Sequence, residues 1–483
     1  MGIAALFALI SVGLQGAGPS QPNVVLVLVD DLGRSDLGVD GSTFHETPRL
    51  DAWARSAVRF TDFYSAHPVC SPTRAALLTS RAPQRLGITD WIHPGSGVAL
   101  AASEITLGEA FQAAGYQTAY LGKWHLGELD SDHPSQHGFA WSRGVNRAGQ
   151  PASFFPPFRN SETRATVWDV PDFGSAQPGD YLTDLLTSSA ISFLEARDPQ
   201  RPFFLCLAHY AVHTPIQAPP GLVEKYRAKR QARFGDSPTP TVSAAPGAVS
   251  RARQDDPAYA AMVENLDTNV GRLLDALDRL KLRDNTLVVF TSDNGGLCTL
   301  EGKSPGPTCN LPWRSGKGWN YEGGIRVPFL ISWPARWSAR TVSLPASTTD
   351  LYPTLVEACG LSSNQNPPRD GHSLVRVLEG QSDPALEQRF LAWYYPHAHG
   401  SGHRPSAALR EGRWKLILSL TDARSELYDL TTDPGETRDQ STTYSEQERR
   451  LRSQLQTWIE ATRVRSPGAE SVPRDPASPR PQP

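Results

Sequence analysis

Four short, continuous apolar runs constrain this sequence most. Residues 23–29 read NVVLVLV, and similar runs recur at 202–208, 286–291 and 327–332. A run without polar alternation is typical of a strand buried on both faces of a parallel sheet. Helical patterns lie between the runs, at 48–58, 104–114, 180–196 and 258–280. This alternation predicts an α/β fold, in which helices sandwich a large mixed, mostly parallel sheet.

The pattern changes from about residue 391, where short alternating runs precede a final helical pattern at 445–463. We therefore expect a main domain over 21–390 and a smaller C-terminal α+β subdomain over 391–465, made of an antiparallel sheet and a helix. The Pro- and Ser-rich segment 227–257 predicts a mobile surface insertion, and 466–483 predicts a disordered tail.

The N-terminus carries an apolar run at residues 3–14, followed by small residues. It is too short to span a bilayer and predicts a signal peptide over 1–20, hence a secreted or periplasmic protein, with a buried first helix as the alternative. No other segment has the length of a transmembrane helix.

Five cysteines are too few for a disulfide scaffold. Cys298 and Cys309 lie in one Gly- and Pro-rich loop, close enough to pair in an oxidising compartment, while Cys206 and Cys359 sit in apolar runs typical of core thiols. Cys70 is left without a structural explanation.

Charge excludes some partners and draws attention to the lysines. The 47 basic and 50 acidic residues give a net charge of −3, which argues against a nucleic-acid or anionic-membrane binder. Only seven of the 47 basic residues are lysines, and Lys123 is the only lysine among the first 224 residues. A lysine retained in such an arginine-rich chain is more often one that a planar guanidinium cannot replace.

Two strand ends carry adjacent oxygen donors. Asp30 and Asp31 follow the run at 23–29, and Asp293 and Asn294 follow the run at 286–291. Chemistry in such sheets gathers beyond the carboxyl ends of the strands, and oxygen ligands suit Ca²⁺ or Mg²⁺ rather than zinc. Each pair alone is more often a solvated turn, so the prediction rests on their convergence.

Cys70 precedes a predicted helix, with Ser71 as the expected N-cap, Pro72 at the first helical position and Arg74 in the first turn. A helix N-terminus favours a bound anion and lowers the pKa of a nearby thiol. Lys123, His125, His213 and Lys317 add cationic and titratable groups. Together with an acidic metal site, these groups indicate hydrolysis of an anionic ester.

At this point the sequence resembles the type I sulfatases of the alkaline-phosphatase superfamily over roughly residues 22–465. The resemblance rests on Cys70-Ser71-Pro72-Thr73-Arg74, on Gly122-Lys123-Trp124-His125-Leu126-Gly127, on Asp30-Asp31-Leu32-Gly33 and on Asp293-Asn294-Gly295. Ser80, where glycine is usual, and Leu121, where a smaller residue is common, depart from the pattern.

The resemblance implies that a maturation enzyme converts Cys70 to formylglycine, whose hydrate is the nucleophile. It implies one Ca²⁺, with Mg²⁺ as the alternative, held by Asp30, Asp31, Asp293, Asn294 and the modified residue 70. Arg74 would position the hydrate, Lys123 and Lys317 would neutralise the sulfate, His125 would deprotonate the hydrate during release, and His213 with Lys317 would protonate the leaving alcohol.

Two alternatives remain open at this point: a phosphonate monoester or phosphodiester hydrolase of the same superfamily, and an inactive carbohydrate-binding homologue. The expected substrate is a sulfated polysaccharide or glycan attacked from its end. Two segments, 91–94 and 396–404, resemble pocket-mouth positions of carbohydrate-active relatives, and Trp141 and Trp319 could stack on a sugar beside them, although surface loops explain all of these residues equally well. The expected substrate-binding side chains are His93, Trp141, Trp319, His397, His399, His403 and Arg404.

Overall fold

A computed structural model describes residues 21–159, 167–245, 248–300, 304–362 and 368–463 of the 483-residue chain. Its centre is an eight-stranded mixed sheet. In spatial order the strands are β13 (Arg340–Val342), β2 (Val58–Phe60), β12 (Phe329–Ser332), β9 (Thr286–Ser292), β1 (Asn23–Val29), β6 (Phe203–Ala208), β4 (Gln117–Gly122) and β5 (Trp141–Arg143).

The central strand β1 shows why the apolar runs are continuous. Alternate side chains of a strand point to opposite faces, so Val24, Leu26 and Leu28 enter one core while Val25 and Val27 enter the other. β1 pairs in parallel with both β6 and β9, and its last residue, Val29, lies opposite Ser292. The two carboxyl ends therefore meet at one edge of the sheet, as predicted.

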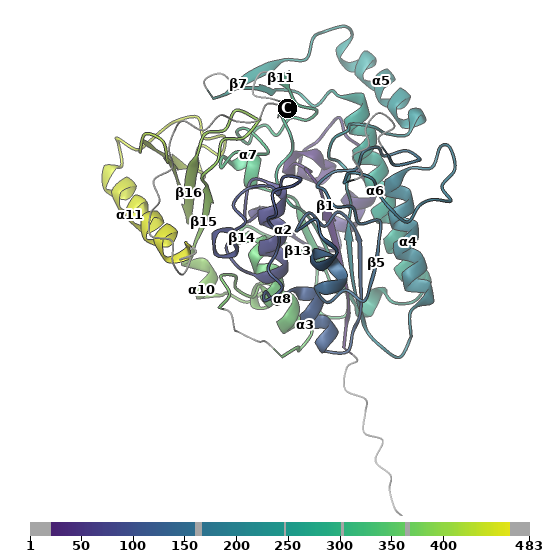
Figure 1. The fold of residues 1–483 in the computed structure, drawn as a ribbon. Helices are drawn as coiled ribbons and strands as arrows, with labels where there is room; N and C mark the ends of the chain where they lie inside the picture. Colours follow the sequence, from purple (N-terminus) through teal and green to yellow (C-terminus); the bar gives the residue numbers. More distant parts are fainter. Residues whose placement is uncertain (1–20, 160–166, 246–247, 301–303, 363–367, 464–483) are drawn as a thin grey trace, which may run out of the picture.

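Helices cover both faces of this sheet (Figure 1). One core takes side chains from α2 (Cys70–Thr79), α3 (Leu107–Ala113), α8 (Leu351–Ala358), α9 (Val375–Leu378) and α10 (Pro384–Glu387). The other core takes side chains from α1 (Pro48–Ala54), α4 (Leu182–Ala196), α5 (Pro220–Phe234) and α6 (Pro257–Arg279). The predicted α/β sandwich is confirmed.

A second, antiparallel sheet forms the C-terminal part. Its strands run in chain order: β15 (Phe390–Tyr395), β16 (Ser406–Glu411), β17 (Trp414–Ser419) and β18 (Ser425–Asp429). Helix α11 (Ser445–Thr462) packs Leu451 and Leu455 on one face, and Figure 1 shows it on the outer side. The other face packs Trp393 and Tyr428 against Ile325 of α7 (Glu322–Ile325).

Two predictions need correction. Strand β12 has the same apolar texture as its neighbours but pairs antiparallel to β9, so burial on both faces does not by itself reveal strand direction. The segment 227–257, expected to be a mobile insertion, contains the second half of α5 and the antiparallel pair β7 (Thr241–Ala245) and β8 (Ala248–Arg251). Tyr226 is fully buried in the core on one face of the central sheet, and Lys229 pairs with Glu46, so α5 is held against the rest of the fold.

The remaining strands are short pairs: β3 (Phe63–Tyr64) with β14 (Ala346–Ser347), and β10 (Thr299–Leu300) with β11 (Ser304–Pro305). The predicted signal peptide at 1–20 and the predicted tail at 466–483 lie outside the described residues. Within the described ranges, the helices are all too short or too polar to cross a bilayer.

Candidate active site

Four buried oxygen-bearing side chains meet where β1 and β9 end. Asp30 and Asp31 follow β1, Asp293 and Asn294 follow β9, and each is 1% exposed or less. The Asp31 amide donates to Asp293 Oδ1 over 3.2 Å, and Asn294 Nδ2 donates to Asp31 Oδ1 over 2.8 Å. The convergence that the sequence predicts is therefore present, and it is tied together by cross-strand hydrogen bonds.

This cluster has the donor set of a hard-cation site. Asp30 Oδ1 and Asn294 Oδ1 are buried and have no hydrogen-bond partner among the described residues. Ligand atoms of Asp30, Cys70 and Asp293 lie within 4.8 Å of one another. Burial, with Asp293 and Asp31 nearby, raises the pKa of Asp30 well above its usual value. A bound divalent cation would offset the cost of such a buried carboxylate, so these residues fit Ca²⁺ or Mg²⁺.

Helix α2 brings Cys70 to this cluster. The helix begins at Cys70 itself and its N-cap is Val69, so the prediction of Ser71 as N-cap is wrong. Ser71 Oγ instead accepts the Ile92 amide over 3.0 Å, which ties the start of α2 to the loop at 90–94. At the other end, Ser80 takes the left-handed conformation that glycine usually supplies, and its hydroxyl accepts the Gly371 amide.

Arg74 lies one turn into α2 and is 1% exposed. Its Nε donates to Asp293 Oδ2 over 2.8 Å and its Nη1 donates to the Lys123 carbonyl, while Nη2 has no partner among the described groups. Asp293 raises the pKa of Arg74 against the effect of burial, so the guanidinium stays charged. One donor is thus left free for a group bound beside residue 70.

Two of the seven lysines complete the charge balance. Lys123, just after β4, places Nζ 2.7 Å from Asp30 Oδ2, and Lys317 places Nζ 2.8 Å from Asp31 Oδ1. Both ammonium groups are buried. The neighbouring Asp31 raises the pKa of Lys317 although burial opposes this, so Lys317 holds its proton at neutral pH. In return, Lys317 and His213 keep the pKa of Asp31 below its usual value despite burial.

His125 and His213 both lie beside Cys70, and their ring nitrogens differ in the contacts that they make. His125 Nε2 donates to the Ile92 carbonyl over 3.0 Å, and its buried Nδ1 has no partner, so Nδ1 is available as a proton acceptor. Burial lowers the pKa of His125 well below its usual value. His213 Nε2 lies 3.7 Å from Asp31 Oδ2. Burial, with Lys317 nearby, lowers the pKa of His213 to about 3.

A cavity of about 520 Å³ opens onto this centre, lined at its base by Cys70, His125, His213 and Lys317. The wall includes Asp90, Trp91, His93, Gln150, Trp168 and His399. Sequence reasoning anticipated His93 and His399 but missed Gln150 and Trp168. Trp168 lies outside any helix or strand, so no periodicity marks it.

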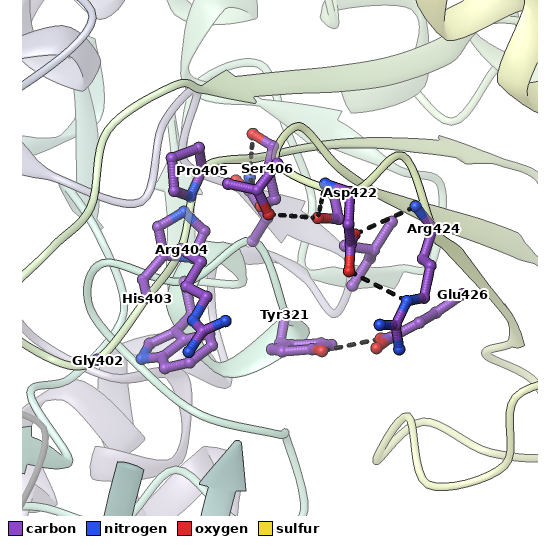
Figure 2. Close-up of a pocket in the computed structure, with 14 residues that line it drawn as sticks. Tyr321, Gly402, His403, Arg404, Pro405, Ser406, Asp422, Arg424 and Glu426 are labelled. Carbon is purple, nitrogen blue, oxygen red and sulfur yellow. Dashed lines mark hydrogen bonds and ion pairs between the residues drawn. The ribbon is translucent and has the colours of Figure 1, made fainter. Parts of the chain in front are cut away.

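The structure places the other expected substrate residues elsewhere. Trp319, His403 and Arg404 line a second cavity beside the C-terminal sheet, shown in Figure 2. His397 contacts Thr89 Oγ1 through Nε2 at 2.9 Å and is not among the residues lining either cavity. Trp141 stacks on Phe193 of α4, with ring centroids 5.5 Å apart, so it covers the sheet edge and does not line the cavity at Cys70.

The remaining cysteines are buried free thiols. Cys298 and Cys309, which could pair by their spacing, are both unpaired. The Cys298 thiol instead lies 3.4 Å from Ser250 Oγ, because β8 passes beside its loop. Cys206 and Cys359 lie in the core, as their apolar surroundings predict.

Comparison with known proteins agrees with this geometry. The family described as Sulfatase matches residues 22–361, and the family described as N-sulphoglucosamine sulphohydrolase, C-terminal, matches residues 314–465. N-acetylgalactosamine-6-sulfatase from Mus musculus is 34% identical over 394 residues, which covers 78% of this chain and 70% of the relative. Steryl-sulfatase from Mus musculus is 31% identical over 88% of this chain and 79% of the relative.

Among solved structures, Ps i-CgsB in complex with k-i-k-neocarrahexaose is similar, with a TM-score of 0.75 and 29% identity over 91% of this chain and 92% of that one. A phosphonate monoester hydrolase of Agrobacterium radiobacter has a TM-score of 0.67 at 20% identity, over 91% of this chain and 96% of the other, which shows a shared fold.

Proposed function

Since this chain belongs to the sulfatase family, as a type I sulfatase of the alkaline-phosphatase superfamily and a sulfuric ester hydrolase, we propose that it removes sulfate from the end of a sulfated glycan. The observation that supports this most is the convergence of Cys70, Arg74, Lys123 and Lys317 on a buried carboxylate cluster. These groups would neutralise a sulfate ester and the charge that develops as its bond to the sugar oxygen breaks.

We propose that a maturation enzyme oxidises Cys70 to formylglycine, whose hydrate supplies one hydroxyl to attack sulfur and a second to lose a proton as sulfate leaves. Arg74 would orient this hydrate through its free Nη2, since its other donors are already held by Asp293 and Lys123. His125 would accept the hydrate proton at Nδ1, which is unpartnered.

Lys317 would protonate the leaving sugar oxygen, and His213 would share this role once the negative charge of a bound sulfate raises its pKa from about 3. Lys317 holds its proton at neutral pH, and both side chains line the cavity beside Cys70. Lys123 would remain paired near Asp30 and neutralise a sulfate oxygen.

Replacing His213 with Ala tests the leaving-group role. We expect an alkyl sugar sulfate to be hydrolysed about 100-fold more slowly, and an activated aryl sulfate less than about tenfold more slowly, because only the poor leaving group needs the proton. Steady-state kinetics on both substrates measure this difference, with His133→Ala, which lies outside the cavity, as the matched control. Equal slowing of the two substrates would refute the role.

We propose that Asp30, Asp31, Asp293, Asn294 and residue 70 hold one Ca²⁺, with Mg²⁺ as the alternative. The ion would supply positive charge that orients a sulfate oxygen and the nucleophile. Support comes from the two unpartnered oxygens, Asp30 Oδ1 and Asn294 Oδ1.

Metal content tests this site without reference to activity. The protein dialysed against Ca²⁺ is expected to hold one ion per chain, and Ca²⁺ at 100 times its Kd is expected to stabilise the fold by about 2.7 kcal/mol. Asp30→Asn should abolish both effects, whereas Asp130→Asn, an exposed carboxylate, should change neither. Elemental analysis and thermal unfolding provide the readouts. Absence of a bound ion after dialysis against either cation would contradict the proposal.

The shape and chemistry of the catalytic cavity support a glycan as substrate. Trp91 and Trp168 provide apolar ring faces, while Asp90, His93 and Gln150 provide polar atoms for hydroxyl groups. Cys70, at the base, is 2% exposed, which favours a terminal sulfated unit over the middle of a long chain. None of the described residues lining this cavity is an arginine, which suits a sugar with a single sulfate and few other charges.

A screen of sulfated oligosaccharides tests the substrate class. Carrageenan, fucan, ulvan and glycosaminoglycan fragments would be incubated with the matured enzyme, and released sulfate and desulfated ends would be identified by mass spectrometry. We expect one class to lose a terminal sulfate. Turnover confined to small aryl sulfates would count against a glycan, and faster turnover of a phosphonate monoester than of any sulfate would favour the rival superfamily activity.

We also propose that the protein is secreted or exported to the periplasm, on the basis of the apolar run at 3–14.

A further inference from the structure

One wall of the catalytic cavity comes from a short loop at residues 146–150, after β5. Gly149 of this loop lies over the His125 ring, where a Cβ atom would be 2.2 Å from Cε1, 2.4 Å from Nδ1 and 2.6 Å from Nε2. The three distances are nearly equal, so this position lies over the ring face rather than at its edge. Ordinary van der Waals contact begins at about 3.4 Å, so any side chain here would displace the ring or the loop by about 1 Å. Gly149 has no positive φ, so the space, and not the backbone conformation, calls for glycine.

Asn146 holds this loop in shape. Its Nδ2 donates to the Gln150 carbonyl over 2.7 Å and to the Trp168 carbonyl over 3.2 Å. Its Oδ1 accepts the Ala148 amide over 3.3 Å. Asn146 is 5% exposed, so breaking these hydrogen bonds would leave buried polar groups without partners. The loop therefore resists displacement, so a side chain at its contact with the imidazole would move the imidazole instead.

Tyr210 fixes the loop to the central sheet. It follows β6 and is fully buried, and its hydroxyl accepts the Asn146 amide over 3.0 Å and donates to the Gly144 carbonyl over 3.0 Å. The carboxyl end of β6 lies beside that of β1, where the carboxylate cluster forms. The loop and the catalytic residues are therefore held by the same edge of the sheet.

The position of the His125 ring decides which of its nitrogens carries a hydrogen. Nε2 donates to the Ile92 carbonyl over 3.0 Å, and the buried Nδ1 has no partner among the described residues. A carbonyl oxygen can only accept, so this bond keeps the hydrogen on Nε2 and leaves Nδ1 able to accept a proton. A ring displaced by about 1 Å would lose good hydrogen-bond geometry with Ile92, and with it the preference for this tautomer.

We infer that Gly149 and Asn146 are positioning residues for His125: Gly149 leaves the space in which the ring lies, and Asn146 holds the loop that closes over it. Together they keep Nδ1 free beside residue 70. The inference rests on the proposed function for the task of His125, which is to accept a proton as sulfate leaves, but the position and tautomer of the ring can be measured without turnover.

Gly149→Ala is expected to lower kcat for an activated aryl sulfate by about tenfold or more, because misplacing a group in an active site by about 1 Å can cost about 100-fold in rate. The value of kcat/KM should stay within about threefold of the parent, because His125 is proposed to act only after the leaving group has departed, so that KM falls with kcat. A burst of aryl alcohol should precede the steady state, since release of sulfate becomes the slow step. Asn146→Ala should give the same split to a lesser extent.

Two comparisons show whether the effect passes through the imidazole. In the His125→Ala protein, Gly149→Ala should cause no further loss of kcat, because the added methyl group then has room. Gly174→Ala is the matched control, since a Cβ atom at Gly174 meets nothing within 4 Å, and it should leave kcat and kcat/KM unchanged.

Nitrogen NMR of ¹⁵N-labelled histidines in the Cys70→Ala protein reports the ring itself, with His125→Gln identifying its signals. His125 is expected to carry its hydrogen on Nε2 in this protein. Adding Gly149→Ala should populate the tautomer with the hydrogen on Nδ1, because the bond to the Ile92 carbonyl is weakened.

The inference is overturned if Gly149→Ala leaves the His125 signals unchanged, if it lowers kcat further in the His125→Ala protein, or if kcat and kcat/KM fall together. If His125→Ala itself leaves kcat unchanged, the proposed function of His125 fails, and the NMR result alone then decides whether the loop positions the ring.

Discussion

Replacing Cys70 with Ala is expected to lower kcat for an aryl sulfate by about 10⁴-fold or more, because it removes the group from which the nucleophile is proposed to form. Arg74, Lys123, His125 and Lys317 would remain in place, but in the proposed mechanism they assist a nucleophile and do not supply one. The measurement is steady-state turnover after expression with a formylglycine-generating enzyme, accompanied by the mass of the Cys70 peptide.

Cys359→Ala is the matched control. It also removes a buried thiol, but from the core beside α8, so activity should stay close to that of the parent protein. If the Cys70 peptide carries only unmodified thiol in an active preparation, or if Cys70→Ala retains activity within tenfold of the parent, the proposed mechanism fails.

Replacing Lys415 with Met is expected to lower the free energy of unfolding by about 3–5 kcal/mol, because it leaves two buried carboxylates without their shared cation. Lys415 of β17 is fully buried, with Nζ 2.9 Å from Glu322 Oε1 and 2.7 Å from Glu436 Oε1. Glu322 lies in α7, five residues after Lys317, so this network joins the C-terminal sheet to a segment that carries one of the proposed catalytic residues. Burial, together with Glu322, already raises the pKa of Glu436 to about 7.

Urea unfolding at several pH values measures this loss. Without Lys415 the folded-state pKa values of both carboxyls should rise while the unfolded state stays the same. The penalty should therefore grow as pH rises from the folded-state pKa of Glu322 in the parent protein, about 2, and level off above the raised pKa values of the variant. Arg279→Met is the control, because it breaks an exposed pair with Glu195 and should cost less than about 1 kcal/mol. A Lys415→Met protein no less stable than this control would contradict the prediction.

The sequence was most informative where one local rule decides the structure. The continuous apolar run at 23–29 predicts a strand buried on both faces, and the acidic pairs after two such runs predict convergence at one edge of the sheet. The structure has both, because β1 and β9 are neighbours. The lysine bias also drew attention to Lys123 and Lys317, which contact Asp30 and Asp31.

The sequence was least informative where contacts between distant segments determine the structure. The direction of β12 depends on how the chain returns to the sheet, and the polar composition of 227–257 does not show that Lys229 of α5 pairs with Glu46. The histidine-rich segment divides between two cavities because it passes along the wall between them, which spacing alone cannot reveal. Trp168 reaches the cavity from an irregular loop and has no sequence signal at all.

Cys70 and the strand β9 that completes its surroundings lie far apart in the sequence, which fixes the order in which they are synthesised. Cys70 is 2% exposed in the folded protein, so the maturation enzyme that we propose would have to reach it before the fold closes. The strand β9 that completes the cluster is made about 220 residues later, which at about 5–20 residues per second is roughly 10 to 45 s of translation. During most of that interval Cys70 is outside the ribosome, while β9, one of the two strands that pair with β1, and Asp293, which pairs with Arg74, do not yet exist. The order of the residues along the chain would therefore leave Cys70 accessible during synthesis for the modification that we propose.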